Sequence, residues 1–230
     1  MFDIHTHILP LVDDGSNSWE TSFQMLKDAA GQGITDIILT PHLQEGQYEC
    51  SREELVQKFN ELNLKKESLN IDLNLYLGQE IYIRKDYAEF FEKNRILTIN
   101  NTKCVLIEFD TQKDFDISET VYDLKRLGFI AIIAHFERYY YADVSVAQEV
   151  KQLGGYIQIN ADSLVGKGKR LYYKKVKQLL KENLVDFVAS DVHDFRENHL
   201  KKAFEMVERK FGLITAQNLF YNNAKKIIKG

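Results

Sequence analysis

The sequence predicts an α/β fold in which seven strand–helix units form a closed or nearly closed barrel. Apolar segments of strand length alternate with amphipathic segments of helix length along the 230 residues, as expected of parallel strands joined by helices. Segments 34–39 and 185–189 are almost wholly apolar, as in strands that helices cover on both faces. An open doubly wound sheet is the alternative. It fits less well, because polar residues follow most strands and a barrel rim brings them to one point.

The individual elements follow from this alternation. Strands are expected near residues 2–6, 35–40, 73–79, 104–109, 129–134, 155–160 and 185–190. Helices are expected over residues 18–32, 51–69, 84–93, 117–127, 144–153, 170–183, 197–211 and 215–222. Gly33 and Gly128 lie where helices should end, because glycine readily adopts the conformation of a C-terminal cap. The irregular segments that follow strands are candidate substrate loops, and they are 8–17, 110–116, 136–143 and 161–169.

The composition is that of one globular domain, which we expect to span residues 1–230. Hydrophobic residues make up 44% and charged residues 28% of the chain, which allows a full core. The formal net charge of −4 disfavours a protein that binds nucleic acid through its phosphates. Cys50 and Cys104 suggest no disulfide framework, so we expect a reduced cytoplasmic setting. We expect no signal peptide and no membrane insertion, although the chain could act at a membrane by binding a membrane protein.

Histidines and acidic residues lie at the ends of the expected strands. His5 and His7 stand two residues apart in the first strand, and Asp191 and His193 follow the last one. Residues i and i+2 of a strand point to the same face, so each pair can direct two ligands into one pocket. The sequence therefore predicts a metal site assembled from the whole fold.

Nine residues form the candidate ligand set. They are His5, His7, Asp14, His42, Glu80, Glu108, His135, Asp191 and His193. Imidazole and carboxylate ligands suit divalent first-row metals, and the absence of cysteine ligands disfavours a closed structural zinc site. Two ions that share a carboxylate would use most of the nine, and three ions would use all of them. Clustered ions suit phosphoester hydrolysis, because they acidify water and stabilise the phosphoryl and leaving oxygens.

Each candidate ligand alone also has a structural interpretation. A His-x-His pair is common on exposed strands, Asp14 could belong to a turn, and Asp191 could cap a helix. Glu80 or Glu108 could be the buried partner of an arginine. The joint pattern carries the prediction, because every member ends or follows a strand.

Two arginines are candidates for phosphate binding. Arg138 follows His135, and its guanidinium could bind a phosphoryl group through two hydrogen bonds. Arg196 follows His193 and is the second candidate, with a surface ion pair as the alternative for Arg138. Cys104 lies inside an apolar strand and Cys50 precedes a helix. Neither therefore heads the phosphate loop that a cysteine-dependent phosphatase requires.

Two further segments lie in the expected rim loops. They are the tyrosine run 139–141 and the basic loop 166–170. Together they could recognise an anionic, tyrosine-bearing peptide. Solvated loops without a role are the alternative.

Eight ordered motifs together resemble one protein family. They are DIHTH (3–7), DDG (13–15), TPH (40–42), GQEIY (78–82), LIEF (106–109), AHFERY (134–139), NADSL (160–164) and ASDVH (189–193). From residue 1 to about 228 the chain resembles the bacterial low-cysteine, metal-dependent protein-tyrosine phosphatases of the polymerase and histidinol phosphatase (PHP) superfamily. Members of this family are encoded with capsule and exopolysaccharide machinery.

The resemblance implies a distorted seven-stranded β/α barrel with three divalent or trivalent metal ions. Manganese is the first choice, and iron, zinc or cobalt are alternatives. One ion would take His5, His7, Glu80 and Asp191, a second Glu80, Glu108 and His135, and a third Asp14, His42 and His193.

The implied reaction is in-line attack of a metal-bridging hydroxide on phosphotyrosine, with Arg138 facing the phosphate and His42 required for activity. The implied substrates are tyrosine-rich tails of bacterial tyrosine kinases that control polysaccharide export. The family often places a second arginine further beyond the Asp-x-His motif, followed closely by proline. Here Arg196 comes early and no proline follows it.

Three other functions are alternatives. The first is another phosphoester hydrolase on the same site, such as a histidinol phosphatase, which is usually larger, or an exonuclease, which should have a more basic groove. The second is a metal-dependent amidohydrolase, which often requires a strand-end lysine. The third is a non-catalytic, metal-dependent module that holds a kinase tail, although binding alone does not require three ions.

Overall fold

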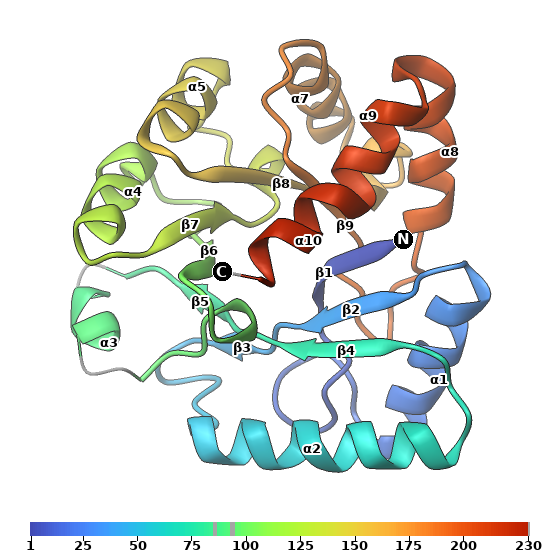
Figure 1. The fold of residues 1–230 in the computed structure, drawn as a ribbon. Helices are drawn as coiled ribbons and strands as arrows, with labels where there is room; N and C mark the ends of the chain where they lie inside the picture. Colours follow the sequence, from blue (N-terminus) through green and yellow to red (C-terminus); the bar gives the residue numbers. More distant parts are fainter. Residues whose placement is uncertain (85–86, 93–94, 230) are drawn as a thin grey trace.

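The computed structural model describes residues 1–84, 87–92 and 95–229, and helices surround its strands (Figure 1). The described strands are β1 (Phe2–Thr6), β2 (Asp36–Leu39), β3 (His42–Leu43), β4 (Asn74–Leu77), β5 (Glu80–Tyr82), β6 (Cys104–Glu108), β7 (Ile130–Ile133), β8 (Tyr156–Asn160) and β9 (Phe187–Ala189). Every pair of neighbouring strands runs parallel. The predicted α/β class with parallel strands is confirmed.

The described strands form two sheets. One sheet has the order β1-β2-β4, and the other has the order β3-β5-β6-β7-β8-β9. The sheets meet beside β1, where Thr6 forms an isolated parallel bridge with Val192 and the N–H of His7 donates to the carbonyl of Val192 at 3.0 Å. The closed seven-stranded barrel is not confirmed, because the described residues form sheets of three and six strands.

In two places where the sequence predicted one strand, the structure has two strands in succession. The strand expected over 35–40 is β2, and β3 follows it beyond Pro41; the strand expected over 73–79 is β4, and β5 follows it from Glu80. Neither β3 nor β5 lies within an expected strand. Pro41 has no N–H for a strand ladder, and a Cβ at Gly78 would lie 2.6 Å from Cδ1 of Ile99. The division brings His42 into register opposite Glu80 in the six-stranded sheet.

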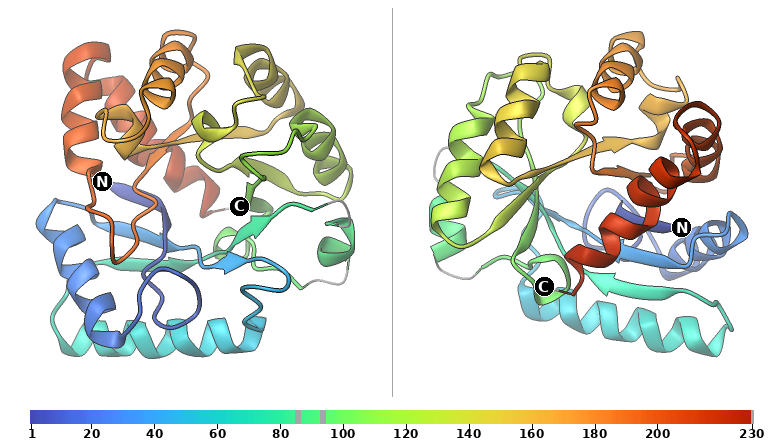
Figure 2. Two further views of the ribbon diagram at one scale, coloured as in Figure 1. Left: turned by 180° about the vertical axis from the view of Figure 1, so that it is seen from behind. Right: turned by 45° about the horizontal axis from the view of Figure 1, so that its top comes forward.

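Helices connect the strands and cover the outer faces of the sheets (Figures 1 and 2). The longer ones are α1 (Trp19–Gly31), α2 (Arg52–Ser68), α4 (Ile117–Arg126), α5 (Val144–Leu153), α7 (Arg170–Lys181) and α8 (Leu200–Phe211). Side-chain caps begin four of them, α1, α2, α4 and α5. Ser51 and Glu54 form a reciprocal capping box on α2, and Asp143 accepts from the N–H groups of Ser145 and Val146 on α5.

The remaining helical segments are short. They are α3 (Ala88–Glu92), α6 (Ala161–Leu164), α9 (Leu213–Gln217), α10 (Asn223–Ile227), the 3₁₀ turns η1 (Ile99–Asn101) and η2 (Phe136–Arg138), and the π turn η3 (Asn218–Asn222). The helix expected over 84–93 lies partly outside the described residues, and α3 occupies its described part. The helix expected over 215–222 is instead the succession α9, η3 and α10. The candidate loops 136–143 and 161–169 contain η2 and α6.

An inner core closes one end of the strands. Phe2, Cys104 and Phe187, near the starts of β1, β6 and β9, share a buried cluster with Ala224 and Ile227 of α10. The cluster continues along the strands to Leu106 and Ala189 in the same alternation that leads to Glu108 and Asp191. The amino ends of the strands are therefore packed with apolar side chains, and the polar residues gather at the carboxyl ends.

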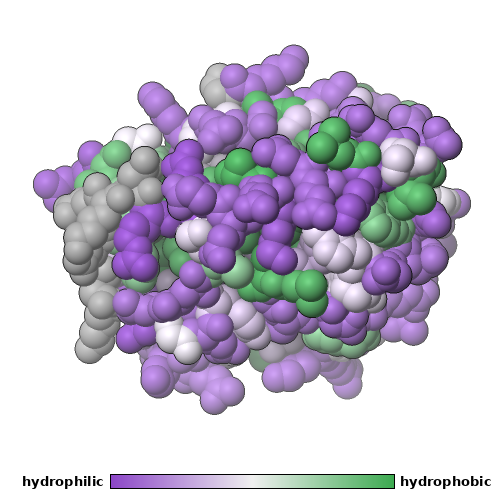
Figure 3. Space-filling view, turned by 90° about the horizontal axis from the view of Figure 1, so that it is seen from below, coloured by the Kyte–Doolittle hydropathy of each residue, from purple (hydrophilic) through white to green (hydrophobic). Residues whose placement is uncertain are grey.

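The outer surface on the side of α2 is mainly hydrophilic. Hydrophobic residues there occur in small groups between polar ones (Figure 3), and α2 itself exposes Val56 and Leu64. Among the described helices, none is both long and apolar enough to cross a membrane.

Candidate metal centre

The structure brings all nine predicted ligand residues into one cluster, which we call the metal centre. They are His5, His7, Asp14, His42, Glu80, Glu108, His135, Asp191 and His193, and imidazole–carboxylate distances of 2.8–3.7 Å connect them or their direct neighbours. They lie near or beyond the carboxyl ends of β1, β2, β4, β6, β7 and β9, and two of them, His42 and Glu80, are the first residues of β3 and β5. The carboxyl ends of parallel strands are the usual location of functional residues in such folds.

Glu80 lies in the middle of the metal centre and is 1% exposed. Its Oε2 atom lies 3.0 Å from Nε2 of His5, 3.2 Å from Nε2 of His7 and 3.1 Å from Nδ1 of His42. Its Oε1 atom lies 3.0 Å from Nε2 of His135. One carboxylate thus faces four imidazoles, which is the position that a ligand shared between ions would occupy.

The potential ligand atoms fall into three overlapping groups. They are His5, His7 and Glu80; His42, Glu80 and Glu108; and His7, Asp14, His42 and His193, and the ligand atoms of each group lie within 4.8 Å of one another. The groups resemble the assignment made from the sequence, with three differences. Asp191 is absent from the first group. His42 rather than His135 completes the second group, and His7 also joins the third.

The hydrogen bonds of the imidazoles fit metal binding. Nδ1 of His5 lies 3.1 Å from Oε1 of Gln158, Nδ1 of His7 lies 2.8 Å from Oδ2 of Asp13, and Nδ1 of His193 lies 3.0 Å from the carbonyl of Asp191. These acceptors require a proton on Nδ1, which leaves the Nε2 lone pair free to bind a metal. Each Nε2 faces the centre.

Two potential ligand atoms lack a hydrogen-bond partner, and two imidazole nitrogens face each other. In the described part of the chain, Oε2 of Glu80 and Nδ1 of His42 are buried without one, and Nε2 of His5 lies 3.1 Å from Nε2 of His7. Buried polar atoms without partners are costly. Cations between these atoms would satisfy them, so the residues present fit a metal cluster.

The charges of the centre are strongly coupled. Burial would raise the pKa of Glu80, but the charges of His5 and His42 outweigh it and hold the pKa well below its usual range. Burial and the charge of Arg138 disfavour the protonated form of His135, but hydrogen bonds to Glu108 and Glu80 raise its pKa to about 9. The carboxylates therefore stay ionised and attract positive charge to the site.

Asp191 links the metal centre to both candidate arginines. Its Oδ2 accepts from Nη2 of Arg138 at 2.8 Å, from Nη1 of Arg196 at 2.7 Å and from Nδ2 of Asn160 at 2.7 Å. Its Oδ1 atom faces His7 at 3.5 Å. Oδ1 of Asp191 therefore faces the metal centre, and Oδ2 faces the two arginines.

Two of the ligand residues have a left-handed backbone. Asp191 has φ of 53° and His135 has φ of 31°, a region that L-residues rarely adopt and that often marks functional sites. Both residues follow the ends of strands, where the backbone turns away from the sheet. Both side chains face the centre from these turns, His135 toward Glu80 and Asp191 toward His5 and His7.

The loop after β1 supplies two acidic residues, only one of which the sequence predicted. Asp14 lies 3.5 Å from both His42 and His193, as expected of a ligand. Asp13 was missed, although its carboxylate contacts His7 and accepts from the N–H groups of Gly15 and His42. A Cβ at Gly15 would lie 2.1 Å from the carbonyl oxygen of His7, so only glycine lets this loop pass so close.

Two buried polar residues of β8 were also missed. Oε1 of Gln158 accepts from the backbone N–H of His135 at 2.8 Å and lies beside His5, and Nε2 of Gln158 donates to Oδ1 of Asn160 at 2.8 Å. The signal was present in the sequence, because Gln158 and Asn160 alternate with Ile157 and Ile159 in a strand that is otherwise apolar. Polar residues on one face of a buried strand require partners.

The tyrosine run does not form one exposed surface. Tyr139 is fully buried, and its hydroxyl accepts from the N–H of Phe109 and lies 3.3 Å from Nδ1 of His135. Tyr140 is 61% exposed and donates to Asp114, while Tyr141 donates to the carbonyl of Asp110. Tyr139 therefore supports the metal centre, and only its neighbours lie near the surface.

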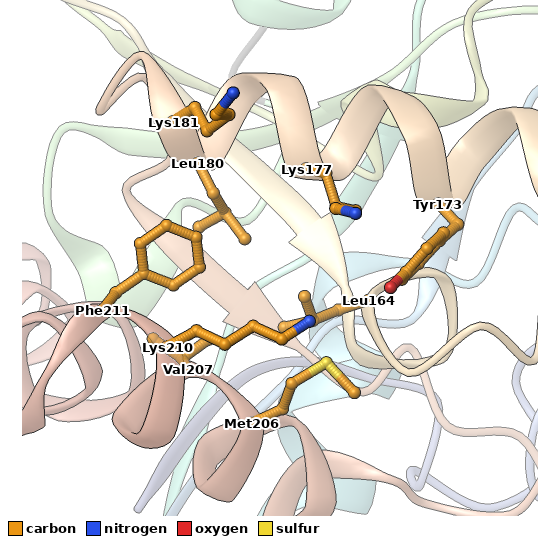
Figure 4. Close-up of a pocket in the computed structure, with 9 residues that line it drawn as sticks. All are labelled: Leu164, Tyr173, Lys177, Leu180, Lys181, Met206, Val207, Lys210 and Phe211. Atoms are coloured by element: carbon orange, nitrogen blue, oxygen red, sulfur yellow. The ribbon is translucent and has the colours of Figure 1, made fainter.

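A separate apolar hollow of about 190 Å³ lies between α7 and α8. Leu180, Val207 and Phe211 line it, with Lys177 and Lys210 at its edge (Figure 4). Its described lining includes none of the nine ligand residues or the two arginines. It is therefore distinct from the metal centre.

Comparison with known proteins gives a family and close structural relatives. The family model described as "Capsular polysaccharide synthesis, CpsB/CapC" matches residues 1–229. The chain is 34% identical to tyrosine-protein phosphatase CpsB of Streptococcus agalactiae, over 100% of this chain and 98% of that protein. It is 36% identical to tyrosine-protein phosphatase YwqE of Bacillus subtilis, over 92% of this chain and 85% of that protein.

Solved structures agree with these relatives. A structure from work on YwqE of Bacillus subtilis and CpsB of Streptococcus pneumoniae, described as metal-dependent tyrosine phosphatases, matches with a TM-score of 0.91 and 33% identity. The match covers 100% of this chain and 94% of that one. A histidinol phosphate phosphatase from Lactococcus lactis matches with a TM-score of 0.58 at 10% identity, over 93% of both chains. At that identity the likeness concerns the fold alone.

Proposed function

Because the chain belongs to the CpsB/CapC family of capsular polysaccharide synthesis, we propose that its metal centre hydrolyses phosphotyrosine in proteins. The chain is a metal-dependent tyrosine-protein phosphatase with a role in capsule or exopolysaccharide synthesis. The observation that carries this conclusion is Glu80, buried among four imidazoles with Asp191 and two arginines beside them.

Three ions account best for the ligand set. Glu80 would be shared by two of them, and the three overlapping groups of ligand atoms support three positions. The ligand sets would be His5, His7, Glu80 and Asp191; Glu80, Glu108 and His135; and Asp14, His42 and His193. Manganese is the first choice for this mixture of imidazole and carboxylate ligands, with iron, zinc and cobalt as alternatives. The corresponding fold is a distorted PHP barrel formed by residues 1–230 as one domain.

Bound ions and side chains would contribute different parts of the reaction. Bound ions would supply an acidified water and charge stabilisation for the phosphoryl and leaving oxygens. Arg138 and Arg196 would bind the remaining phosphoryl oxygens, since guanidinium groups pair well with phosphate. A phenol has a pKa near 10, so tyrosine leaves as a phenolate with little help from a general acid.

Aromatic side chains at the edge of the centre support a preference for tyrosine. Phe195 lies between His193 and Arg196 in sequence, is 69% exposed, and its ring centroid is 5.1 Å from that of His193. Tyr48 stacks on His42 with a centroid distance of 5.4 Å. An exposed phenylalanine beside the ligands can pack on the phenyl ring of phosphotyrosine, whereas phosphoserine offers no such surface.

The substrates that this family membership favours are phosphorylated, tyrosine-rich tails of bacterial tyrosine kinases. The chain would meet a membrane-bound kinase from the cytoplasm without entering the membrane itself. Nucleic acid is not a favoured partner, because the formal net charge is −4 and phosphate-backbone binding requires clustered cations.

A comparison of four substrates tests this function. Manganese-loaded protein should hydrolyse a phosphotyrosine kinase-tail peptide, with much lower turnover of a phosphoserine peptide, histidinol phosphate and single-stranded DNA. His42→Ala should lose most activity while keeping its far-ultraviolet circular dichroism. His199→Ala is the matched control, because His199 is the histidine outside the nine ligand residues. Faster turnover of histidinol phosphate or DNA would replace the proposed function with one of those activities.

A further inference from the structure

A groove of about 830 Å³ opens beside the metal centre, where β3, β5 and β6 end. Its described lining consists of Gln44, Glu45, Tyr82, Ile83, Arg84, Asp110, Lys113, Asp114, Phe115 and Asp116. This volume is far larger than one phosphotyrosine side chain requires, so the groove has room for additional residues of a substrate.

Three segments of the chain connect residues of the metal centre to the lining of the groove. His42, Glu80 and Glu108 are each followed, two residues later, by the lining residues Gln44, Tyr82 and Asp110. Tyr82 stands opposite Glu108 in the register of β5 and β6. In a strand, residues two apart share a face, so Tyr82 extends the face on which Glu80 lies. A peptide that extends from the centre along these strands would reach the groove.

Hydrogen bonds hold the wall of the groove in place. The Tyr140 hydroxyl donates to Oδ1 of Asp114 at 2.6 Å, and the Tyr141 hydroxyl donates to the carbonyl of Asp110 at 3.0 Å. Phe115 packs against Phe109, with ring centroids 5.6 Å apart. The wall is therefore formed before a substrate arrives, and a preformed surface reduces the entropy cost of binding.

The described lining of the groove carries more negative than positive side chains. Its described lining carries the carboxylates Glu45, Asp110, Asp114 and Asp116 and the cations Arg84 and Lys113. Arg84 lies 3.5 Å from Glu45 and Lys113 lies 4.0 Å from Asp110. Within the described chain, Asp114 and Asp116 have no cation within 4.0 Å. The groove therefore keeps an excess of negative charge.

We propose that this groove binds the polypeptide on one side of the phosphotyrosine and favours lysine or arginine there. The inference rests on the proposed phosphotyrosine activity. The metal centre attracts the phosphate, while Asp114 and Asp116 attract a cationic side chain a few residues away, so charge complementarity orients the substrate.

The test uses three phosphotyrosine peptides that differ only in flanking residues, which are lysine, alanine or glutamate. The kcat/KM of the lysine peptide should exceed that of the glutamate peptide by about fivefold at low salt, since each exposed charge pair changes binding modestly. The ratio should fall as salt is added. Each value is divided by that for p-nitrophenyl phosphate, which has no flanking chain.

The Asp114→Asn variant tests whether the preference for lysine arises in the groove. Asparagine keeps an oxygen that can accept from Tyr140 but removes the charge, so the lysine-to-glutamate ratio should fall by about half. Glu205→Gln removes one charge from the exposed face of α8 and should leave the ratio unchanged. Equal kcat/KM for the three peptides, or an unaltered ratio in Asp114→Asn, overturns the groove proposal while phosphotyrosine turnover persists. Absence of turnover on every peptide and on p-nitrophenyl phosphate overturns the proposed function and this inference with it.

Discussion

Arg138 and Arg196 donate to the same oxygen, Oδ2 of Asp191, at 2.8 and 2.7 Å. Burial of Asp191 would raise its pKa, but the charges of Arg138, His5 and Arg196 hold the pKa well below its usual range. Both arginine side chains are about one-quarter exposed. They therefore connect a buried carboxylate of the metal centre to the surface from which a phosphoryl group would arrive.

Replacing either arginine should reduce catalysis more than stability. Arg138→Ala and Arg196→Ala should each lower kcat/KM for a phosphotyrosine peptide by about 10- to 100-fold, because each removes charged hydrogen bonds. Since the two groups share one acceptor, the double variant should lose less than the product of the single losses. Arg209→Ala, at an exposed position of α8, is the control. Wild-type kcat/KM in both single variants would show that neither arginine takes part in catalysis.

Asp13 should strengthen metal binding indirectly, because it orients the His7 ring, and should not bind metal itself. Asp13→Ala removes the acceptor that fixes the His7 ring, so metal affinity or activity should fall by about 10- to 100-fold. Asp13→Asn keeps an acceptor oxygen and should recover part of the loss. The measurement is a titration of activity against manganese concentration. An unchanged manganese requirement in Asp13→Ala would show that His7 needs no such support.

Phe195 should affect aryl substrates selectively. Phe195→Ala removes the ring beside His193 and should lower kcat/KM for phosphotyrosine peptide by about three- to tenfold, the usual contribution of an aromatic contact. Turnover of a phosphoserine peptide should change little, and Phe195→Leu should lie between the two. Equal losses on both peptides would mean that Phe195 supports the fold of the loop and does not select the substrate.

Lys175 should make stability depend on alkaline pH. Its ammonium donates to the carbonyl of Tyr139 at 2.5 Å, and burial lowers its pKa from 10.5 to about 8, against the opposing charges of Glu137 and Asp143. Between about pH 8 and pH 10.5, Lys175 is protonated in the unfolded chain but has lost its proton in the folded chain. The free energy of unfolding contributed by Lys175 therefore rises with pH over this interval.

Urea unfolding at several pH values from 7.5 to 10.5 measures this contribution. The rise should be smaller in Lys175→Met than in wild type. Lys174→Met, at the exposed neighbouring position, should keep the wild-type dependence. The same pH dependence in all three proteins would contradict the burial of a lysine whose proton is lost near pH 8.

The clustering of the nine candidate ligand residues was predictable because its signals are local. His5 and His7, and Asp191 and His193, keep a spacing of two next to apolar segments, and the structure brings all four together. The residues that hydrogen-bond to these histidines were not predictable in the same way. Asp13 is read as part of a turn until the structure shows its carboxylate on His7, and Gln158 reaches His5 across 153 residues of sequence.

The fold was predictable in class but not in strand continuity. Alternating apolar segments suffice for parallel strands with helices, since that pattern follows from burial on both faces. At the break between β4 and β5, Ile99 leaves no room for a side chain at Gly78, and only the assembled structure creates this close approach. Likewise, nothing local indicates that Asp191 and His135 adopt a left-handed backbone, because surrounding packing imposes that conformation.

The most direct test of the metal centre is elemental analysis of protein equilibrated with manganese, made together with a phosphotyrosine assay. The wild-type chain should bind three ions, and chelation should remove both the ions and the activity, with recovery when manganese returns. His42→Ala should bind fewer ions and lose most activity while remaining folded. Full phosphotyrosine turnover by protein that holds no metal would contradict the account.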